Sequence, residues 1–275
     1  MAGADLRKKL ESGGIVYGTM LSLSRNPRWA RVIGQLKFDY VIIDNEHSAY
    51  SRGEVADFIA ALSATGTTPL IRVPIPASHY VTMAVDAGAH GVLAPYCETV
   101  DEVKEVVGAA KWRPLKGALV RQVMETGEFP SQASKAYLQN ANANSIVMVG
   151  IESVPAVENL EAILKVKGID AIFVGPNDLS ISMGIPNQYE HPDFEEMLRS
   201  IIRTCSARNI PVAVHLHSVP LTTKWIQEGV RFVLHITDTR AMHEGFRSDF
   251  EAIRKFASEI QGRAAEGVKE SDEVI

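Results

Sequence analysis

The sequence predicts an α/β protein, a closed (β/α)₈ barrel, from three observations. Short apolar runs alternate with amphipathic segments of helical length along nearly the whole chain, which is typical of βα units and a parallel sheet. We count eight such runs. Eight βα units of about 30 residues need roughly 240 residues, which is close to the 275 residues of the chain.

The eight predicted strands share apolar and β-branched residues. They are Ile15–Met20, Tyr40–Ile43, Pro69–Val73, Gly91–Ala94, Ile146–Ile151, Ala171–Val174, Pro211–Val214 and Arg231–Ile236. A doubly wound open sheet is the alternative, and it usually carries a G-x-G-x-x-G turn after its first strand. Here Gly18-Thr19-Met20-Leu21-Ser22 stands at that place, so the sequence favours the barrel.

The predicted helices are the amphipathic segments between these runs. They are Glu54–Ser63, Tyr80–Ala87, Val100–Ala110, Val154–Lys165, Phe194–Arg208, Pro220–Glu228 and Arg240–Ile260. Asn26-Pro27 places proline at a first helical position, and Ser78 or Thr99 is suited to capping the helix that follows it. One long connection, Lys111–Ser145, contains a predicted helix at Gln132–Asn140, and its length indicates a lid or a contact between subunits.

Composition narrows the classes of function. Lys and Arg total 28 against 33 Asp and Glu, a net charge of −5, and there is no block of basic residues. Nucleic-acid binding is therefore disfavoured. The amino terminus has no apolar leader and no stretch is long enough to cross a membrane, and two distant cysteines fit a reducing compartment, so we expect a cytoplasmic protein. We expect one barrel over residues 1–260 and a polar tail over 261–275.

Charged residues follow four of the eight predicted strands. In barrel enzymes the carboxyl ends of the strands form the active site, so these residues should converge on one mouth. They are Asp44, Glu46 and His47 after the second run, Arg72 in the third, Glu152 after the fifth and Asp178 after the sixth.

Glu152 and Asp178 suit a hard divalent cation, which takes a few carboxylates and completes its shell with water and substrate oxygens. The alternative is that Asp178 caps a helix and Glu152 pairs with an arginine. His47 lies three residues after Asp44, close enough for that carboxylate to orient the imidazole as a general base, although a lone histidine is more often structural. Arg72 should meet an anion, from the protein or the substrate.

His215 and His217 lie on one face of the seventh run, because side chains alternate along a strand. With no third ligand at a sensible spacing, lining of the substrate pocket is favoured over zinc binding. No lysine ends a strand, so a Schiff-base aldolase is not indicated, and neither a serine-hydrolase elbow nor a phosphate-binding loop is present.

Five motifs, taken in chain order, carry a resemblance to a known family. They are Asp44-x-Glu46-His47, Ile71-Arg72-Val73-Pro74, Asp86-x-Gly88, Ile151-Glu152-Ser153 and Phe173-Val174-Gly175-Pro176-Asn177-Asp178-Leu179-Ser180. From about Leu6 to Ala257 the chain resembles the HpcH/HpaI aldolases, metal-dependent class II pyruvate aldolases related to citrate lyase β subunits and macrophomate synthase. The resemblance implies a barrel of the phosphoenolpyruvate/pyruvate type.

The resemblance also implies an activity. The enzyme would reversibly cleave a 4-hydroxy-2-oxo acid, of the 4-hydroxy-2-oxoheptanedioate or 2-dehydro-3-deoxyaldarate type, into pyruvate and an aldehyde through a metal-bound pyruvate enolate. Glu152 and Asp178 would hold Mg²⁺, Mn²⁺ or Co²⁺. Oxaloacetate decarboxylation or macrophomate-synthase-like enolate chemistry is one alternative. A noncatalytic barrel that binds a ligand or a partner is another.

By the same resemblance, His47 and Asp44 would activate a metal-bound water as the base, and Arg72 would steady the enolate and the aldehyde oxygen. The backbone at Gly175, Pro176, Asn177 and Asp178 would grip the substrate carboxylate, and His215 would line the aldehyde half of the pocket.

The resemblance further implies a homo-oligomer. Asp86 matches a residue supplied by a neighbouring subunit. The expected assembly is a hexamer or a trimer of dimers in which the helix Arg240–Gln261 is exchanged between subunits. The chain departs from the family at Asn45, Asn177 and Met20, where Gly, Ala and Trp are usual, so the pyruvate half of the site is better specified than the aldehyde half.

Overall fold

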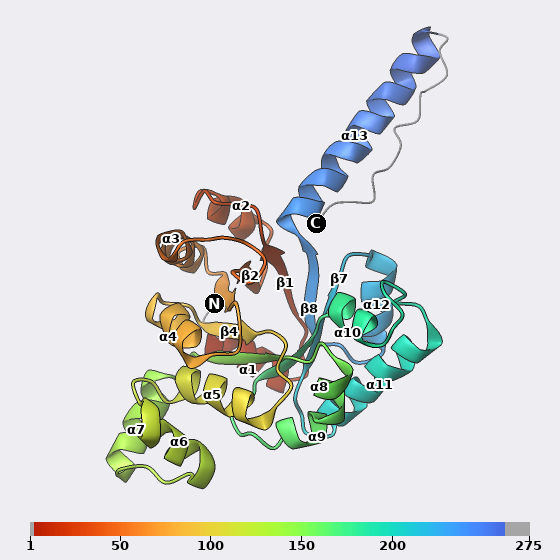
Figure 1. The fold of residues 1–275 in the computed structure, drawn as a ribbon. Helices are drawn as coiled ribbons and strands as arrows, with labels where there is room; N and C mark the ends of the chain where they lie inside the picture. The colour runs from red at the N-terminus through yellow and green to blue at the C-terminus, as the bar shows by residue number, and fades with distance from the viewer. Residues whose placement is uncertain (1–2, 262–275) are drawn as a thin grey trace.

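Eight parallel strands close into a barrel, each strand pairing with its neighbours in sequence and β8 with β1 (Figure 1). The computed structural model describes residues 3–261. The strands are β1 (Val16–Leu21), β2 (Tyr40–Asp44), β3 (Thr68–Arg72), β4 (Gly91–Ala94), β5 (Ile146–Gly150), β6 (Ala171–Val174), β7 (Val212–Leu216) and β8 (Phe232–Thr237). Each overlaps its predicted run and ends within two residues of it, which confirms the barrel.

Helices surround the barrel and precede or follow its strands. They are α1 (Gly3–Glu11), α2 (Trp29–Gln35), α3 (Arg52–Ser63), α4 (Ser78–Asp86), α5 (Val100–Lys111), α6 (Gly117–Thr126), α7 (Gln132–Ala141), α8 (Val154–Glu158), α9 (Leu160–Ile163), α10 (Pro176–Ser182), α11 (Pro192–Ser206), α12 (Val219–Gln227) and α13 (Asp238–Gln261). The polar tail expected from residue 261 lies, beyond Gln261 itself, outside the described residues.

The predicted helix starts are confirmed at one of three places. Thr99 caps α5 in a capping box with Glu102, as expected from its side-chain oxygen. Ser78 is the first residue of α4 rather than its cap, and its amide donates to Glu105 instead. Pro27 belongs to the turn that precedes α2, because the helix begins at Trp29.

The alternation of side chains along the strands divides the core into two layers. One apolar cluster lies inside the barrel and includes Tyr40 and Ile42 from β2, Leu70 from β3 and Phe173 from β6. A second, larger cluster lies between the strands and the surrounding helices. The inward positions are one residue in two. The side chains that continue each inward row past the apolar layer therefore stand at the carboxyl-terminal mouth.

The opposite end of the barrel is closed by α1. Leu6 is fully buried and belongs to the inner cluster, and Leu10 packs against it. Arg7 holds the helix in place through Asp170, with 2.7 Å between Nε and Oδ1. Because this helix fills the amino-terminal end of the barrel, the carboxyl-terminal mouth is the end left for ligands.

The long connection after α5 lies beside the barrel wall. A side chain on Gly108 of α5 would contact Val120 and Met124 of α6, and Figure 1 shows α6 and α7 outside α5, away from the end where α13 leaves. The expectation of a lid over the chain's own mouth is therefore wrong. A contact between subunits stays a prediction for this segment.

Helix α13 leaves the barrel from the carboxyl end of β8 and projects away from it (Figure 1). Along its length large apolar side chains are exposed. They are Met242, Phe246, Phe250, Ile253, Phe256 and Ile260. Within residues 3–261 no helix is both long and apolar enough to cross a membrane, and both cysteines, Cys97 and Cys205, are free and buried.

Candidate active site

Asp44 and Arg72 occupy matching positions at the ends of β2 and β3, where the strand register pairs the two residues directly. Both continue inward-facing rows, Asp44 after Tyr40 and Ile42 and Arg72 after Leu70. The guanidinium and the carboxylate form a two-pronged ion pair, with Nε 2.9 Å from Oδ1 and Nη2 2.8 Å from Oδ2. Burial alone would raise the pKa of Asp44, but the hydrogen bonds and charge of Arg72 hold it below its usual value. Asp44 is therefore a fixed anion that orients Arg72.

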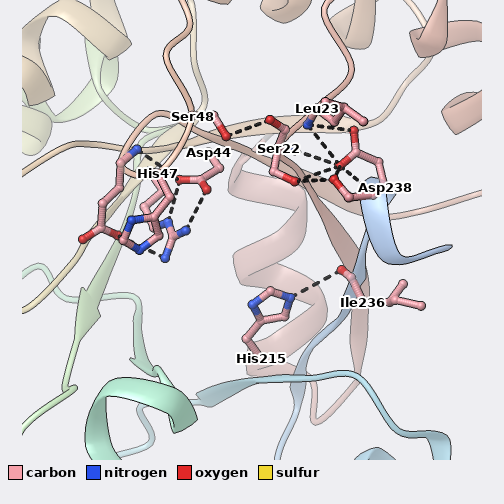
Figure 2. Close-up of polar contacts among 11 residues, drawn as sticks. Ser22, Leu23, Asp44, His47, Ser48, His215, Ile236 and Asp238 are labelled. Carbon is pink, nitrogen blue, oxygen red and sulfur yellow. Dashed lines mark hydrogen bonds and ion pairs between the residues drawn. The ribbon is translucent and has the colours of Figure 1, made fainter. Parts of the chain in front are cut away.

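Glu46 also contacts Arg72, with 3.0 Å between Oε2 and Nη1. Burial raises the pKa of Glu46, partly opposed by Arg72 and His47 and reinforced by Asp44 and Asp178. The His47 side chain is 65% exposed, and its Nε2 lies 3.6 Å from the same Glu46 oxygen. We expected Asp44 to orient the imidazole. That expectation is wrong, because Asp44 instead accepts the backbone amides of Glu46 and His47 at 3.0 and 3.3 Å. Figure 2 shows His47 beside Asp44 at the mouth.

Glu152 enters the mouth from the end of β5, and two glycines make room for its carboxylate. A Cβ atom at Gly175 would lie 2.2 Å from Oε1, and one at Gly150 would lie 3.0 Å from Oε2. The backbone amide of Tyr96 donates to Oε2 at 2.6 Å. Tyr96 holds a φ of +50°, which is uncommon for a bulky residue. The backbone here therefore leaves space for the Glu152 carboxylate at two glycines and donates a hydrogen bond to it from Tyr96.

The environment of Glu152 disfavours an unpaired negative charge on its carboxylate. Its side chain is almost fully buried, and burial raises its pKa to about 7, with Glu46 and Asp178 acting in the same direction and Tyr96 and Arg72 opposing them. Between Gly3 and Gln261 no three His, Cys, Asp or Glu side chains gather into a complete metal site. Mg²⁺ is commonly held by one or two carboxylates together with water and substrate oxygens. Glu152 and Asp178 fit that kind of site.

The segment Gly175–Asp178 forms the start of α10, with Gly175 as the N-cap and Pro176 in the first turn. Proline has no N–H, so Pro176 cannot donate to a substrate carboxylate as the expected grip requires. Asn177 and Asp178 follow it in the first turn, where amides lack partners within the helix. The alternative in which Asp178 caps this helix is wrong, since the N-cap is Gly175 and Asp178 is the third residue of α10.

His215 extends the inward row of β7, and its ring lies 4.6 Å from that of His217 in an edge-to-face arrangement. Burial, together with the nearby His217 and Arg72, lowers the pKa of His215 to about 3. Its Nε2 lies 3.4 Å from the carbonyl oxygen of Ile236 (Figure 2). The ring is therefore neutral at pH 7 and lies within electrostatic reach of Arg72.

Asp86 is the one predicted site residue that the chain does not bring to its own mouth. It ends α4, and helices that follow the strands run back toward the amino-terminal end of the barrel. The Asp86 carboxylate is 60% exposed and lies 3.0 Å from Nη1 of Arg113.

Sequence reasoning missed two contributors to the mouth. Tyr96 acts only through its backbone amide, and nothing in its residue type signals that. Asp238 follows the eighth predicted strand and accepts hydrogen bonds from the loop after β1. Extending the search for charged strand ends to that run would have found it.

Comparison with known proteins places these features in a family. Residues 19–240 match the HpcH/HpaI aldolase/citrate lyase family model. A hydroxypyruvate/pyruvate aldolase from Roseobacter denitrificans is 29% identical over 231 residues, covering 82% of this chain and 88% of the relative. A 2-keto-3-deoxy-L-rhamnonate aldolase from Salmonella paratyphi B is 30% identical over 257 residues, covering 92% of this chain and 94% of the relative.

Solved structures agree. The HpcH/HpaI aldolase from Desulfitobacterium hafniense superposes with a TM-score of 0.79 at 29% identity, covering 90% of this chain and 96% of that one. The citrate lyase β subunit from M. tuberculosis, complexed with oxaloacetate and magnesium, shares the fold with a TM-score of 0.51 at 15% identity, covering 83% and 93%. The match over most of the barrel, together with this closed eight-stranded architecture, shows that the chain belongs to the HpcH/HpaI aldolase/citrate lyase family.

Proposed function

We propose that this protein is a divalent-metal-dependent lyase that reversibly cleaves a 4-hydroxy-2-oxo acid into pyruvate and an aldehyde. One observation carries the proposal. The oriented cation Arg72 and the buried carboxylate Glu152 face the same mouth, where each affects the pKa of the other. A 2-oxo acid presents oxygens for both a metal and a guanidinium. The names of the curated relatives, which act on pyruvate and on a 2-keto-3-deoxy acid, support this substrate class.

Glu152 and Asp178 would hold the cation, Mg²⁺, Mn²⁺ or Co²⁺. When bound, the cation supplies Lewis-acid stabilisation of the negative charge that develops on the 2-oxo oxygen. The carboxylate of Glu152 suits this role because it is buried, two glycines leave space for it, and burial together with the charges of Glu46 and Asp178 raises its pKa, so that a cation would stabilise its ionised form. The magnesium in the related citrate lyase β subunit supports the choice of metal.

Arg72 would bind substrate oxygens. A guanidinium has five N–H donors, and Arg72 directs three of them at Asp44 and Glu46. Two N–H groups are left for a substrate, and the three protein contacts fix the plane in which they lie. Arg72 would thereby stabilise charge on the substrate without having to reorient.

His47 would move the proton. In the cleavage direction the C3–C4 bond breaks as the 4-hydroxyl gives up its proton, which yields the aldehyde and leaves the electron pair on C3. Return of that proton to C3 then completes pyruvate, so the reaction needs no other proton source. His47 is suited to accept the hydroxyl proton, because its exposed ring stands at the mouth beside Glu46, whose carboxylate would stabilise the imidazolium.

We also propose that the protein works as a homo-oligomer, a hexamer or a trimer of dimers, with α13 exchanged between copies. The exposed apolar stripe of α13 matches a second one formed by Trp29 and Val32 of α2 and by Leu36, which follows that helix directly. In Figure 1 α13 does not fold back beside α2, so an α13 from another copy would cover both stripes. Assembly would also supply Asp86, whose exposed carboxylate is far from the mouth of its own chain.

The test is pyruvate release over a panel of 4-hydroxy-2-oxo acids, with and without a chelator. We expect activity that disappears on metal removal and returns with Mg²⁺ or Mn²⁺. Full activity after thorough metal removal would contradict the metal-dependent mechanism. Borohydride trapping with pyruvate should give no covalent adduct, because none of the eight described strands ends in a lysine. Including oxaloacetate in the panel distinguishes decarboxylation, and inactivity on every substrate would favour a noncatalytic barrel.

A further inference from the structure

The first residue of α13, Asp238, binds the loop that follows β1. Its carboxylate accepts the backbone amides of Ser22, Leu23 and Ser24 at 2.9, 3.2 and 2.8 Å, and the Ser24 hydroxyl at 2.6 Å. It also accepts the Ser22 hydroxyl at 3.1 Å. Burial would raise the pKa of Asp238, but these hydrogen bonds hold it below its usual value. One ionised carboxylate thus joins the base of α13 to residues 22–24.

The loop at residues 22–24 in turn contacts the segment that carries His47. The Ser48 hydroxyl donates to the carbonyl oxygen of Ser22 at 2.7 Å, and the Tyr50 hydroxyl donates to that of Ser24 at 2.9 Å. Figure 2 shows this connection running from Asp238 through Ser22 to Ser48 beside His47. The His47 side chain is largely exposed, so its position depends on the backbone of this segment, which Asp44 holds from one side through the amides of Glu46 and His47 and the loop at residues 22–24 holds from the other.

The backbone near the carboxyl end of β8 is strained at Ile236, two residues before Asp238. Ile236 has a φ of +55°, a genuine outlier for a β-branched residue. Such conformations persist only where the surroundings impose them. Here the carbonyl oxygen of Ile236 accepts the Thr19 hydroxyl at 2.9 Å and faces Nε2 of His215 at 3.4 Å. The backbone at Ile236 is therefore held by Thr19 of β1 and by His215 at the mouth.

We propose that Asp238 is a positioning residue for the segment 44–50, and that it links the placement of α13 to the placement of His47. The catalytic meaning of this link rests on the proposed lyase function, whereas the mechanical link does not. Asp238 touches no reacting atom in this arrangement. It acts through Ser22 and Ser48, by removing the freedom of the loop on which His47 stands.

The sharpest variant is Asp238→Asn. A carboxylate only accepts hydrogen bonds, whereas an amide has two donors of its own, so asparagine would turn N–H groups toward the amides of residues 22–24. Asp39→Asn is the matched control. Asp39 accepts the amide of Tyr17 at 2.9 Å and pairs with Lys9 at 2.8 Å, so it holds β1 and β2 at the opposite end of the barrel.

Hydrogen–deuterium exchange of the full-length protein is the direct readout, because the amides of Glu46 and His47 are protected by Asp44. We expect Asp238→Asn to accelerate exchange of peptides 20–25 and 44–50 by about tenfold or more while peptide 146–150 in β5 stays as in the wild type. Asp39→Asn should leave peptide 44–50 unchanged. Unchanged exchange at 44–50 in a folded Asp238→Asn protein would overturn the proposal, as would equal acceleration everywhere.

Ser48→Ala provides a second test if Asp238→Asn fails to fold. It removes only the bond to Ser22, so peptide 44–50 should exchange faster while the melting temperature remains that of the wild type. No acceleration in Ser48→Ala would contradict the link. In an active enzyme, Asp238→Asn should lower kcat by more than it changes KM. If no aldolase activity exists in the wild type, the proposed function fails while the exchange results still decide the role of Asp238.

Discussion

The guanidinium of Arg72 and the carboxylate of Asp44 make two parallel contacts of 2.9 and 2.8 Å at directly paired positions of neighbouring strands. Asp44 is 2% exposed and Arg72 is 7% exposed. Removing one partner from such a buried pair leaves the other charge without compensation, and the cost is larger than the contribution of the pair itself.

Arg72→Ala should therefore destabilise the fold as well as remove activity. We expect a loss of about 3–5 kcal/mol in the free energy of unfolding, measured by urea denaturation. Arg203→Ala is the control, because Arg203 forms an ion pair with Glu196 in which both side chains are more than half exposed, and such pairs contribute about 1 kcal/mol or less. If the two variants lose the same small amount of unfolding free energy, the prediction for the buried Arg72–Asp44 pair is contradicted.

Gly175→Ala should disturb Glu152 directly. The added methyl group would stand 2.2 Å from Oε1, so the carboxylate must move from its place between β5 and β6. We expect Mg²⁺ to raise the melting temperature of the wild type, because a ligand that binds the folded state stabilises it, and to leave the melting temperature of Gly175→Ala unchanged. Thermal denaturation with and without the metal measures both. Gly53→Ala in α3 is the control, since its Cβ would have only one neighbour, at 4.0 Å. A normal magnesium response in Gly175→Ala would contradict a metal site at Glu152.

His215 should make stability depend on pH in the acid range. Burial lowers its pKa to about 3 in the folded chain, against about 6.5 for an unperturbed histidine. Between these values the unfolded chain binds a proton that the folded chain does not, so stability is present above about pH 6.5 and is lost as the pH falls toward 3. At pH 5 the loss from this group is roughly 2 kcal/mol.

His215→Asn removes that titration. The difference in unfolding free energy between the variant and the wild type, measured by urea denaturation at pH 8 and at pH 5, should shift by that amount in favour of the variant at pH 5. An unchanged difference would show that His215 titrates alike in both states.

Phe250→Asp should break the proposed assembly. Phe250 is half exposed in the middle of the α13 stripe, where a charge would be buried on association. We expect a smaller particle by sedimentation velocity and loss of activity, because Asp86 would no longer be supplied by a neighbour. Lys255→Asp introduces the same side chain on the opposite face of the helix and should leave the particle unchanged. An unchanged mass in both variants would rule out an assembly that covers the stripe.

The strands could be predicted because each is a short run rich in apolar and β-branched residues between helical segments, and in a (β/α)₈ barrel the strands pair in chain order. Helices α1 and α6 could not be, since both are short, weakly apolar on average and stabilised by what they cover, as Leu6 shows. The Asp44–Arg72 pair follows from strand alternation and register. The contact of His47 with Glu46 does not, because a turn after a strand obeys no such period. The bonds from Asp238 join residues more than 200 positions apart, which no local pattern records.

The closure of the barrel also determines how copies of this protein can meet. Every strand from β1 to β8 has a partner on both sides, so the described chain has no sheet edge at which a foreign strand could add. Recognition between copies is left to helix surfaces, where contacts depend on side chains rather than on the backbone. Contact surfaces of that kind can change by single substitutions without altering the strands that carry the mouth. Substitutions that change the assembly can therefore leave the residues at the mouth unaffected. Asp238 is the exception, because it joins the base of α13 to the loop after β1.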